Sequence, residues 1–380
     1  MKWKLVAAVF LACTASLQAA SLQAADEIET LRSVGAEAAG AAQARQARDV
    51  LVAGGSDNLV PVLEGFRGST VLASNWLRST FESIADQQLK SGKGLPQAEL
   101  LSFVRDTTQS PAARRLAYEW LRKESADLEE QLIPSMLLDP NPEFRRDAVS
   151  RLVDQAKAAN GPKAIEIYQS ALAGAVHEDQ VKIIAEALRA AEVEVDIQKH
   201  FGFLPSWKVI GPFNNRDLVG FSIAYPPEKK IEIAAEYDGQ LGQVSWQPIN
   251  TEDDYGVVDI GKQIENYKGS LMYATTTFRS DQAQSVELRL GTPNAWKLWV
   301  NGDLVFQREE YHRSTQMDQY KVPVKLRKGD NVLLLKVCQN EQEQSWAQDY
   351  KFQLRVCDAT GSAVLSAGTI NDLSQIKSGN

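Results

Sequence analysis

The chain has few of the residues that carry metal or nucleophilic chemistry. Its 380 residues include three histidines, His177, His200 and His312, and no His-x-x-x-His or Cys-x-x-Cys spacing. Zinc and iron centres draw on such closely spaced ligands, so neither is expected. A Gly-x-Ser-x-Gly elbow and a glycine-rich loop that opens a helix are also missing, which removes the usual signatures of serine hydrolases and nucleotide binding. No cofactor is expected.

A block of basic residues is missing as well. The formal net charge is −8, with 41 Lys and Arg against 49 Asp and Glu. An acidic chain without a basic block does not neutralise phosphates well. Nucleic acid is therefore not expected as a partner.

The first 25 residues are typical of a secretory signal peptide. "MKWKLVAAVFLACTASLQAA" begins with two lysines, continues with an apolar run from Leu5 to Ala12 and ends in small residues. That run is too short to span a bilayer. The tandem "SLQAASLQAA" offers a similar cleavage site at the end of each copy, and we expect the second, after Ala24 or Ala25. The sequence thus predicts an exported protein, periplasmic or extracellular, without a transmembrane segment after cleavage.

Three cysteines leave two questions open. Cys13 raises the alternative of a lipid anchor, although the residue three positions before it is Phe10 and not leucine. After export only Cys338 and Cys357 remain, and two cysteines in an oxidising compartment can pair. Both lie late in candidate strands, at opposite ends of the ladder of a simple hairpin. A disulfide and two buried thiols remain equal alternatives.

Residues 26–200 have the periodicity of helices and contain an internal repeat. "SPAARRLAYEWL" and "NPEFRRDAVSRL" superpose at an offset that places Pro111 on Pro142 and Arg114 on Arg145. Proline is favoured in the first turn of a helix because its missing N–H would be unpaired there. The stretch "DPNPEFRRDAV" resembles HEAT-type repeats. The resemblance implies an α-solenoid, in which stacked helix pairs share a core and leave an extended binding face; a plain helical bundle is the alternative.

A short linker, residues 201–206, precedes a change in the sequence pattern. From 207 to 367 about nine short runs alternate apolar and polar residues between turn signals, as in "SVELRLG" and "YKFQLRV". Such runs without intervening helices predict an antiparallel β-sandwich. The expected fold is therefore multidomain α plus β, and residues 368–380 form a polar tail.

One stretch of this half carries a second resemblance. In "KLWVNGDLVF", Asn301-Gly302 suits a two-residue type I′ hairpin, because both central positions need a positive φ. Trp299 would then face Leu304, and Leu298 would face Val305. Together with the later "LRKGDNVLLLKV", the stretch "KLWVNGDLVF" resembles the jelly roll of the galactose-binding-like superfamily. This is the non-catalytic sugar-binding type of domain attached to glycoside hydrolases. The resemblance implies a fold, and members of one fold differ in function.

Aromatic residues near polar loops are the best candidates for a binding site. Sugars stack C–H faces on flat rings while polar side chains bond the hydroxyls. The expected platform and its polar partners are Trp296, Glu310, Tyr311, His312, Arg313 and Trp346. Together they predict a non-catalytic binding protein that holds a glycan or a protein partner, with the helical half as a second interaction surface.

Two alternatives accompany this hypothesis. The chain is a structural part of an envelope complex, or it is a glycosidase or esterase in which two carboxylates meet, with Glu309, Glu310, Asp253 and Asp254 as candidates. Adjacent acids in a polar loop are more often a solvated surface. Loop carboxylates also suit a structural calcium ion, although an ordered Asp-x-Asp-x-Asp loop is missing.

Overall fold

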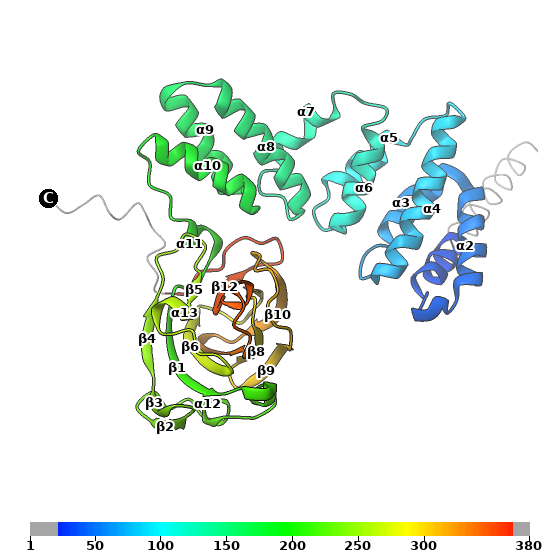
Figure 1. Ribbon diagram of the computed structural model, residues 1–380. Helices are drawn as coiled ribbons and strands as arrows, with labels where there is room; N and C mark the ends of the chain where they lie inside the picture. Colours follow the sequence, from blue (N-terminus) through cyan, green and yellow to red (C-terminus); the bar gives the residue numbers. More distant parts are fainter. Residues whose placement is uncertain (1–21, 368–380) are drawn as a thin grey trace, which may run out of the picture. The chain divides into compact units, whose positions relative to one another are not determined.

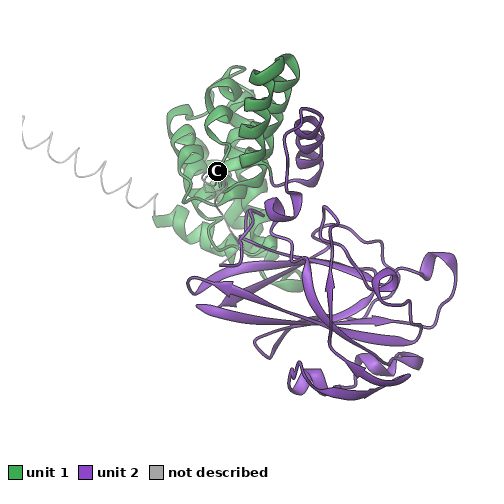
Figure 2. Ribbon diagram, turned by 90° about the vertical axis from the view of Figure 1, so that its left-hand side faces the viewer, with its two compact units in different colours: residues 1–175 green, residues 176–380 purple. Residues whose placement is uncertain are grey.

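The computed structural model describes residues 22–367. They fall into two compact units that divide between Ala175 and Val176 (Figure 1, Figure 2). The predicted signal peptide up to residue 21, Cys13 and the predicted tail lie outside the described residues. Helices make up the N-terminal half and antiparallel sheets the C-terminal half, which confirms the predicted α plus β character. In the described part of the chain, no helix is both long and apolar enough to cross a membrane.

The first unit is helical throughout. It opens with a helix over 22–32, and its other elements are η1 (Ala36–Ala38), α2 (Ala41–Gly54), η2 (Gly55–Asn58), α3 (Leu59–Glu64), α4 (Val71–Lys90), α5 (Gln97–Arg105), α6 (Pro111–Leu121), α7 (Leu128–Leu132), η3 (Ile133–Ser135), α8 (Pro142–Ala158) and α9 (Gly161–Gly174). One hydrophobic core runs through the unit from Ala24 on the first helix to Ala148 on α8. Small alanines at Ala85, Ala113 and Ala117 let the helices approach closely.

The repeat has a structural basis at the start of α6 and α8. Pro111 and Pro142 each lie in the first turn of their helix, and the Asn141 side chain accepts the backbone N–H groups of Glu143 and Phe144. Arg114 on α6 is fully buried and forms two hydrogen bonds of 2.7 Å with Asp139. Its counterpart Arg145 on α8 donates to the backbone oxygen of Gly174 at 3.0 Å. The arginines therefore tie successive helical segments together.

The second unit begins with two helices and continues as strands. Its helical elements are α10 (Glu178–Ala190), α11 (Ile197–Phe201), η4 (Arg216–Phe221), α12 (Pro226–Lys229), α13 (Ile260–Gln263) and η5 (Ser345–Ala347). Its strands are β1 (Ser206–Asn214), β2 (Glu236–Gly239), β3 (Gly242–Ser245), β4 (Gln247–Asn250), β5 (Val258–Asp259), β6 (Ser270–Ser280), β7 (Gln284–Gly291), β8 (Ala295–Val300), β9 (Asp303–Arg308), β10 (Tyr320–Leu326), β11 (Gly329–Gln339) and β12 (Lys351–Cys357).

Two larger sheets share one core. The six-stranded sheet has the order β4-β1-β6-β11-β8-β9, the four-stranded sheet has the order β10-β7-β12-β5, and β2 and β3 form a separate hairpin. Alternate residues of both sheets enter the same hydrophobic cluster, for example Leu335 from β11 and Leu354 from β12. The alternation seen in "YKFQLRV" and "SVELRLG" is the pattern that places these side chains in the shared core.

The outer face of the six-stranded sheet carries a second, smaller core. Residues 216–246, called here the cover segment, pack Phe221, Tyr225 and Trp246 against outward-facing side chains of the sheet. Lys336 lies in the middle of this face and is fully buried. Its Nζ donates to the Glu228 carboxylate at 2.8 Å and to the backbone oxygens of Phe221 and Ile223 at 3.1 and 2.8 Å. Because all three donors have partners, this buried charge fixes the cover segment in place.

The predicted hairpin is present, with one correction in its register. Asn301 and Gly302 have φ values of 55° and 92°, as a type I′ turn requires, and Trp299 faces Leu304. Leu298, however, faces Phe306 and not Val305, because a bulge shifts the register between Leu298 and Trp299.

The same turn is bonded to the neighbouring strand. The Asn301 side-chain oxygen accepts the Val332 N–H at 3.0 Å, and its amide donates to Asn331 Oδ1 at 3.0 Å. Asn331 is fully buried and also bonds the backbone of Arg327 and Gly329. The Asn-Gly turn and the later Gly-x-Asn turn are therefore one hydrogen-bonded unit.

Both cysteines of the second unit are free and buried. Cys338 lies on β11 in the six-stranded sheet, and Cys357 lies on β12 in the four-stranded sheet. Burial raises the pKa of the Cys338 thiol to about 12 and that of Cys357 to about 11. Of the two open alternatives, the structure shows buried thiols.

Candidate functional site

The structure removes Trp296 from the candidate platform. Its side chain is fully buried in the shared core, where it stacks on Phe306 with ring centroids 5.0 Å apart and contacts Tyr320 at 5.1 Å. Trp296 faces inward because β8 lies inside the six-stranded sheet and this residue shares its inner face with Leu298. A ligand cannot reach it without opening the core.

Three of the predicted residues do come together at one rim of the second unit. The His312 ring stands edge-on to Trp346, with ring centroids 5.2 Å apart, and the ring of Tyr311 lies 6.4 Å from that of His312. The Trp346 side chain is 61% exposed, whereas Tyr311 and His312 are half-buried. These three residues are called the aromatic rim below.

Two asparagines hold the half-buried rings. The Asn340 side-chain oxygen lies 2.7 Å from His312 Nε2, and the Asn340 amide donates to Gln342 Oε1 at 2.9 Å. Asn215, fully buried beneath the rim, donates to the Tyr311 hydroxyl at 3.2 Å. His312 adopts a φ of 56°, which is uncommon for a residue other than glycine and is maintained here by these contacts.

The loop that carries Trp346 is fixed at several points. Lys268 Nζ donates to the backbone oxygen of Ala347 at 2.8 Å, and the Asn266 amide donates to that of Gln348 at 2.8 Å. Trp346 itself lies on the short helix η5. A large exposed ring on a fixed loop loses little conformational entropy when it binds a ligand.

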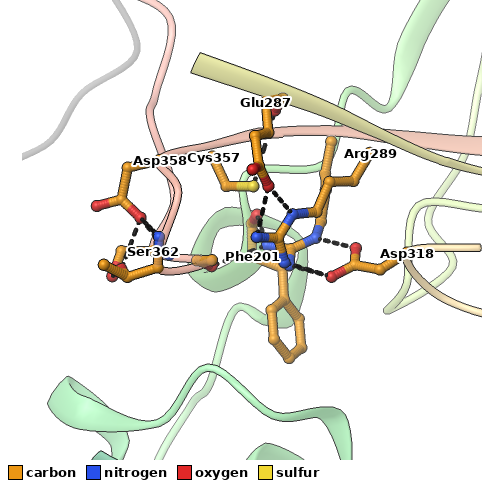
Figure 3. A network of polar contacts seen from close by, with 10 residues as sticks. Phe201, Glu287, Arg289, Asp318, Cys357, Asp358 and Ser362 are labelled. Atoms are coloured by element: carbon orange, nitrogen blue, oxygen red, sulfur yellow. Dashed lines mark hydrogen bonds and ion pairs between the residues drawn. The ribbon is translucent and has the colours of Figure 1, made fainter. Parts of the chain in front are cut away.

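The loop that carries Tyr311 and His312 is anchored at its far end by a buried ion cluster (Figure 3). Asp318 accepts two hydrogen bonds of 2.6 Å from Arg355 and one of 2.7 Å from Arg289. Arg289 also bonds Glu287 at 2.8 Å, and Arg355 bonds the backbone oxygen of Phe201 at 3.1 Å. Burial alone would raise the pKa of Asp318, but the two arginines hold it below its usual value. The cluster joins β7, β12, α11 and the loop.

Glu310 and Arg313 form an ion pair beside the rim. The Glu310 carboxylate lies 2.8 Å from Arg308 and 3.2 Å from Arg313. The hydrogen bond from Arg308 holds the pKa of Glu310 below its usual value. A general acid of a glycosidase needs a raised pKa, so this environment opposes that role. The side chain of Arg313 is 60% exposed, so its guanidinium group still presents hydrogen-bond donors to solvent.

Two of the other candidate carboxylates, Asp253 and Asp254, are engaged in local structure, whereas Glu309 is exposed. Asp253 accepts the backbone N–H groups of Tyr255 and Val257 at 2.9 and 3.2 Å, and Asp254 pairs with Arg189 at 2.7 Å. Within residues 22–367, no three His, Cys, Asp or Glu side chains are grouped so that they could hold a metal ion.

Sequence reasoning missed Asn215, Asn340 and the Asp318 cluster. Asn340 follows a buried strand directly, as binding residues often do, and this is the signal that could have indicated it. The alternation in "YKFQLRV" predicts that Arg355 lies on the polar face of β12, but Arg355 is fully buried because other segments cover that face. Asn215 and Asp318 have no comparable signal, because their partners lie far away in the sequence.

Comparisons with known proteins give little information about function. No protein-family model matches the chain, and no curated protein matches it. Among solved structures, a β-glucosidase from Kluyveromyces marxianus in complex with glucose is 11% identical, with 40% of this chain and 16% of that chain covered and a TM-score of 0.27. An α-xylosidase from Xanthomonas citri is 12% identical, with 41% and 16% covered and a TM-score of 0.20. Similarity at this level supports no functional assignment.

Proposed function

We propose that the protein is an exported, non-catalytic binding protein whose second unit recognises a carbohydrate at the aromatic rim. The observation that carries this proposal is the position of Trp346, which is 61% exposed on a loop fixed by Lys268 and Asn266. An exposed indole offers a flat face to the C–H groups of a sugar ring. Asn340, Gln342 and Arg313 supply hydrogen-bonding groups on the same and the adjoining loop.

Replacing Trp346 with alanine tests the rim. We expect glycans that bind the wild-type chain on an array to bind the Trp346→Ala variant at least about tenfold more weakly, because the ring supplies most of the contact area. Leu241→Ala, which removes an exposed side chain of the β2–β3 hairpin, should bind as the wild type does. The absence of any glycan signal from the wild-type chain would contradict sugar recognition and favour a part in an envelope assembly.

The non-catalytic character is tested by turnover. We expect no hydrolysis of chromogenic glycosides or esters, because Glu310 is paired with two arginines, and both Asp253 and Asp254 have structural partners. Product release that is abolished in a Glu310→Gln variant would contradict this expectation and restore the enzyme hypothesis. A Glu236→Gln variant is the matched control, because Glu236 is exposed on β2 and is not among the candidate carboxylates.

We further propose that the first unit is a HEAT-like α-solenoid with a second interaction surface. Support comes from the repeated helix start with Pro111 and Pro142 and from the equivalent buried arginines Arg114 and Arg145. For the second unit we propose a galactose-binding-like jelly-roll sandwich. The bonded pair Asn301 and Asn331 supports this, because it joins the two turns on which the resemblance rests.

A further inference from the structure

The outer face of the six-stranded sheet is only partly protected by the cover segment. Beside that segment lies an open groove of about 850 Å³ that extends over β4, β1, β6 and β11. Its floor consists of side chains that are cross-strand neighbours on this face, and its wall includes Ile231 and Ile233 of the cover segment. The groove is separate from the residues of the aromatic rim.

Two rows of side chains on paired strands form the floor of the groove. Lys208 is paired with Pro248 on one side and with Thr275 on the other. Ser206 is paired with Asn250, to which its hydroxyl donates at 2.6 Å, and Thr277 is paired with Val332. Hydroxyls, an amide and an ammonium group thus alternate with aliphatic side chains, and Ile233 is 41% exposed above them.

Charge and ring content narrow the class of ligand. Among the described residues that line the groove, Lys208 is the one charged side chain, although the chain as a whole carries a net charge of −8. The one aromatic residue of the lining, Trp207, is 3% exposed and offers no face for a sugar. A ligand that matches this surface carries a negative charge and aliphatic groups.

The groove also borders an edge strand with free backbone groups. β4 is the last strand of its sheet. Thr251 donates its backbone N–H to Pro205 at 3.1 Å, toward β1. In an antiparallel ladder the next residue points its N–H and C=O the other way, so those of Asn250 face the open edge. An extended peptide can bond such an edge while alternate side chains enter the groove.

We propose that this groove binds an extended acidic peptide segment of a partner protein, with a carboxylate on Lys208 and aliphatic side chains against Ile231, Ile233 and Val332. The peptide lies along β4, so its backbone bonds Asn250. This interaction is independent of sugar binding at the aromatic rim, and a variant of one site leaves the other intact.

The test uses a fluorescein-labelled octapeptide of alternating valine and aspartate, with fluorescence anisotropy on the full chain. We expect binding that weakens about fivefold in Lys208→Gln and more than tenfold in Thr277→Trp, whose indole fills the groove. Added salt should weaken binding to the wild type but have less effect on Lys208→Gln. Lys321→Gln, an exposed lysine on a strand of the other sheet, is the matched control and should bind normally.

Several results would overturn the proposal. No binding of the octapeptide, or equal binding of a valine–lysine counterpart, would exclude an acidic peptide. A labelled oligogalacturonate that binds where the peptide does not would make the ligand an acidic glycan. Binding of the peptide only to a chain that ends at Ala367 would assign the groove to residues 368–380. Self-association that Thr277→Trp abolishes would assign it to a second copy. Circular dichroism of each variant excludes misfolding as the cause.

Discussion

Replacing Asp318 with asparagine is expected to lower the free energy of unfolding of the second unit by about 3–5 kcal/mol. Arg289 and Arg355 lie directly opposite each other on β7 and β12, and both bond the Asp318 carboxylate. The side chain of Arg355 is fully buried, so loss of the carboxylate leaves a guanidinium with an uncompensated charge in the interior. Urea unfolding monitored by tryptophan fluorescence measures the change.

A surface ion pair provides the control for Asp318. Asp330 lies 3.8 Å from Arg279, and both side chains are at least 60% exposed. Asp330→Asn should change the free energy of unfolding by no more than about 0.5 kcal/mol, because water screens exposed pairs. Equal effects of the two substitutions would show that the buried cluster does not stabilise the unit.

The Asp318 cluster also predicts a dependence on pH. The folded carboxyl group has a lowered pKa, so its contribution to stability is fully present above the unfolded pKa of about 3.9 and is lost as the pH falls through the folded value. The difference in stability between the wild type and Asp318→Asn should therefore shrink in acid. A difference that stays constant from neutral pH to below the folded pKa would contradict this assignment.

Replacing Asp139 with asparagine is expected to destabilise the first unit by a similar amount, about 3–5 kcal/mol. The side chains of Arg114 and Asp139 are 1% and 5% exposed and form a pair with two hydrogen bonds. Asp139 Oδ1 also accepts the backbone N–H of Asn141, which caps α8. The substitution leaves the buried Arg114 charge uncompensated and loosens the start of α8. Thermal unfolding followed by far-UV circular dichroism measures the loss of helix.

The matched control for Asp139 is Glu130→Gln. Glu130 pairs with Arg151 on the surface of the same unit, and the Glu130 side chain is 62% exposed. We expect a change within about 1 kcal/mol. If Glu130→Gln were as destabilising as Asp139→Asn, general electrostatics and not the buried pair would explain the effect.

The sequence predicts the classes of secondary structure well, because they rest on local periodicity. Helical starts at Pro111 and Pro142, the alternation of β12 and the turn at Asn301 depend on residues close together in the chain. The bulge next to Trp299 changes the register without a local signal. The predicted partner of Leu298 was therefore wrong. Local pattern fixes element type better than it fixes pairing.

The candidate site shows the same difference between local features, which the sequence predicts, and long-range pairing, which it does not. Tyr311 and Trp346 are polar-loop aromatics, and their proximity depends on a fold that brings segments from three loops to one rim. Trp296 follows a turn in the sequence just as a rim residue would, but the pleat of β8 turns it into the core. Lys336 was a signal that sequence reasoning did not use, because a lysine inside the apolar run "VLLLKV" needs a buried partner.

The two thiols have a consequence for how the chain can be produced. Cys338 and Cys357 belong to different sheets, and at neutral pH both stay protonated because burial raises their pKa values. No disulfide bond between these two cysteines stabilises the second unit, so a reducing agent breaks no covalent bond there. We therefore expect a chain made under reducing conditions to reach the same fold as one made under oxidising conditions.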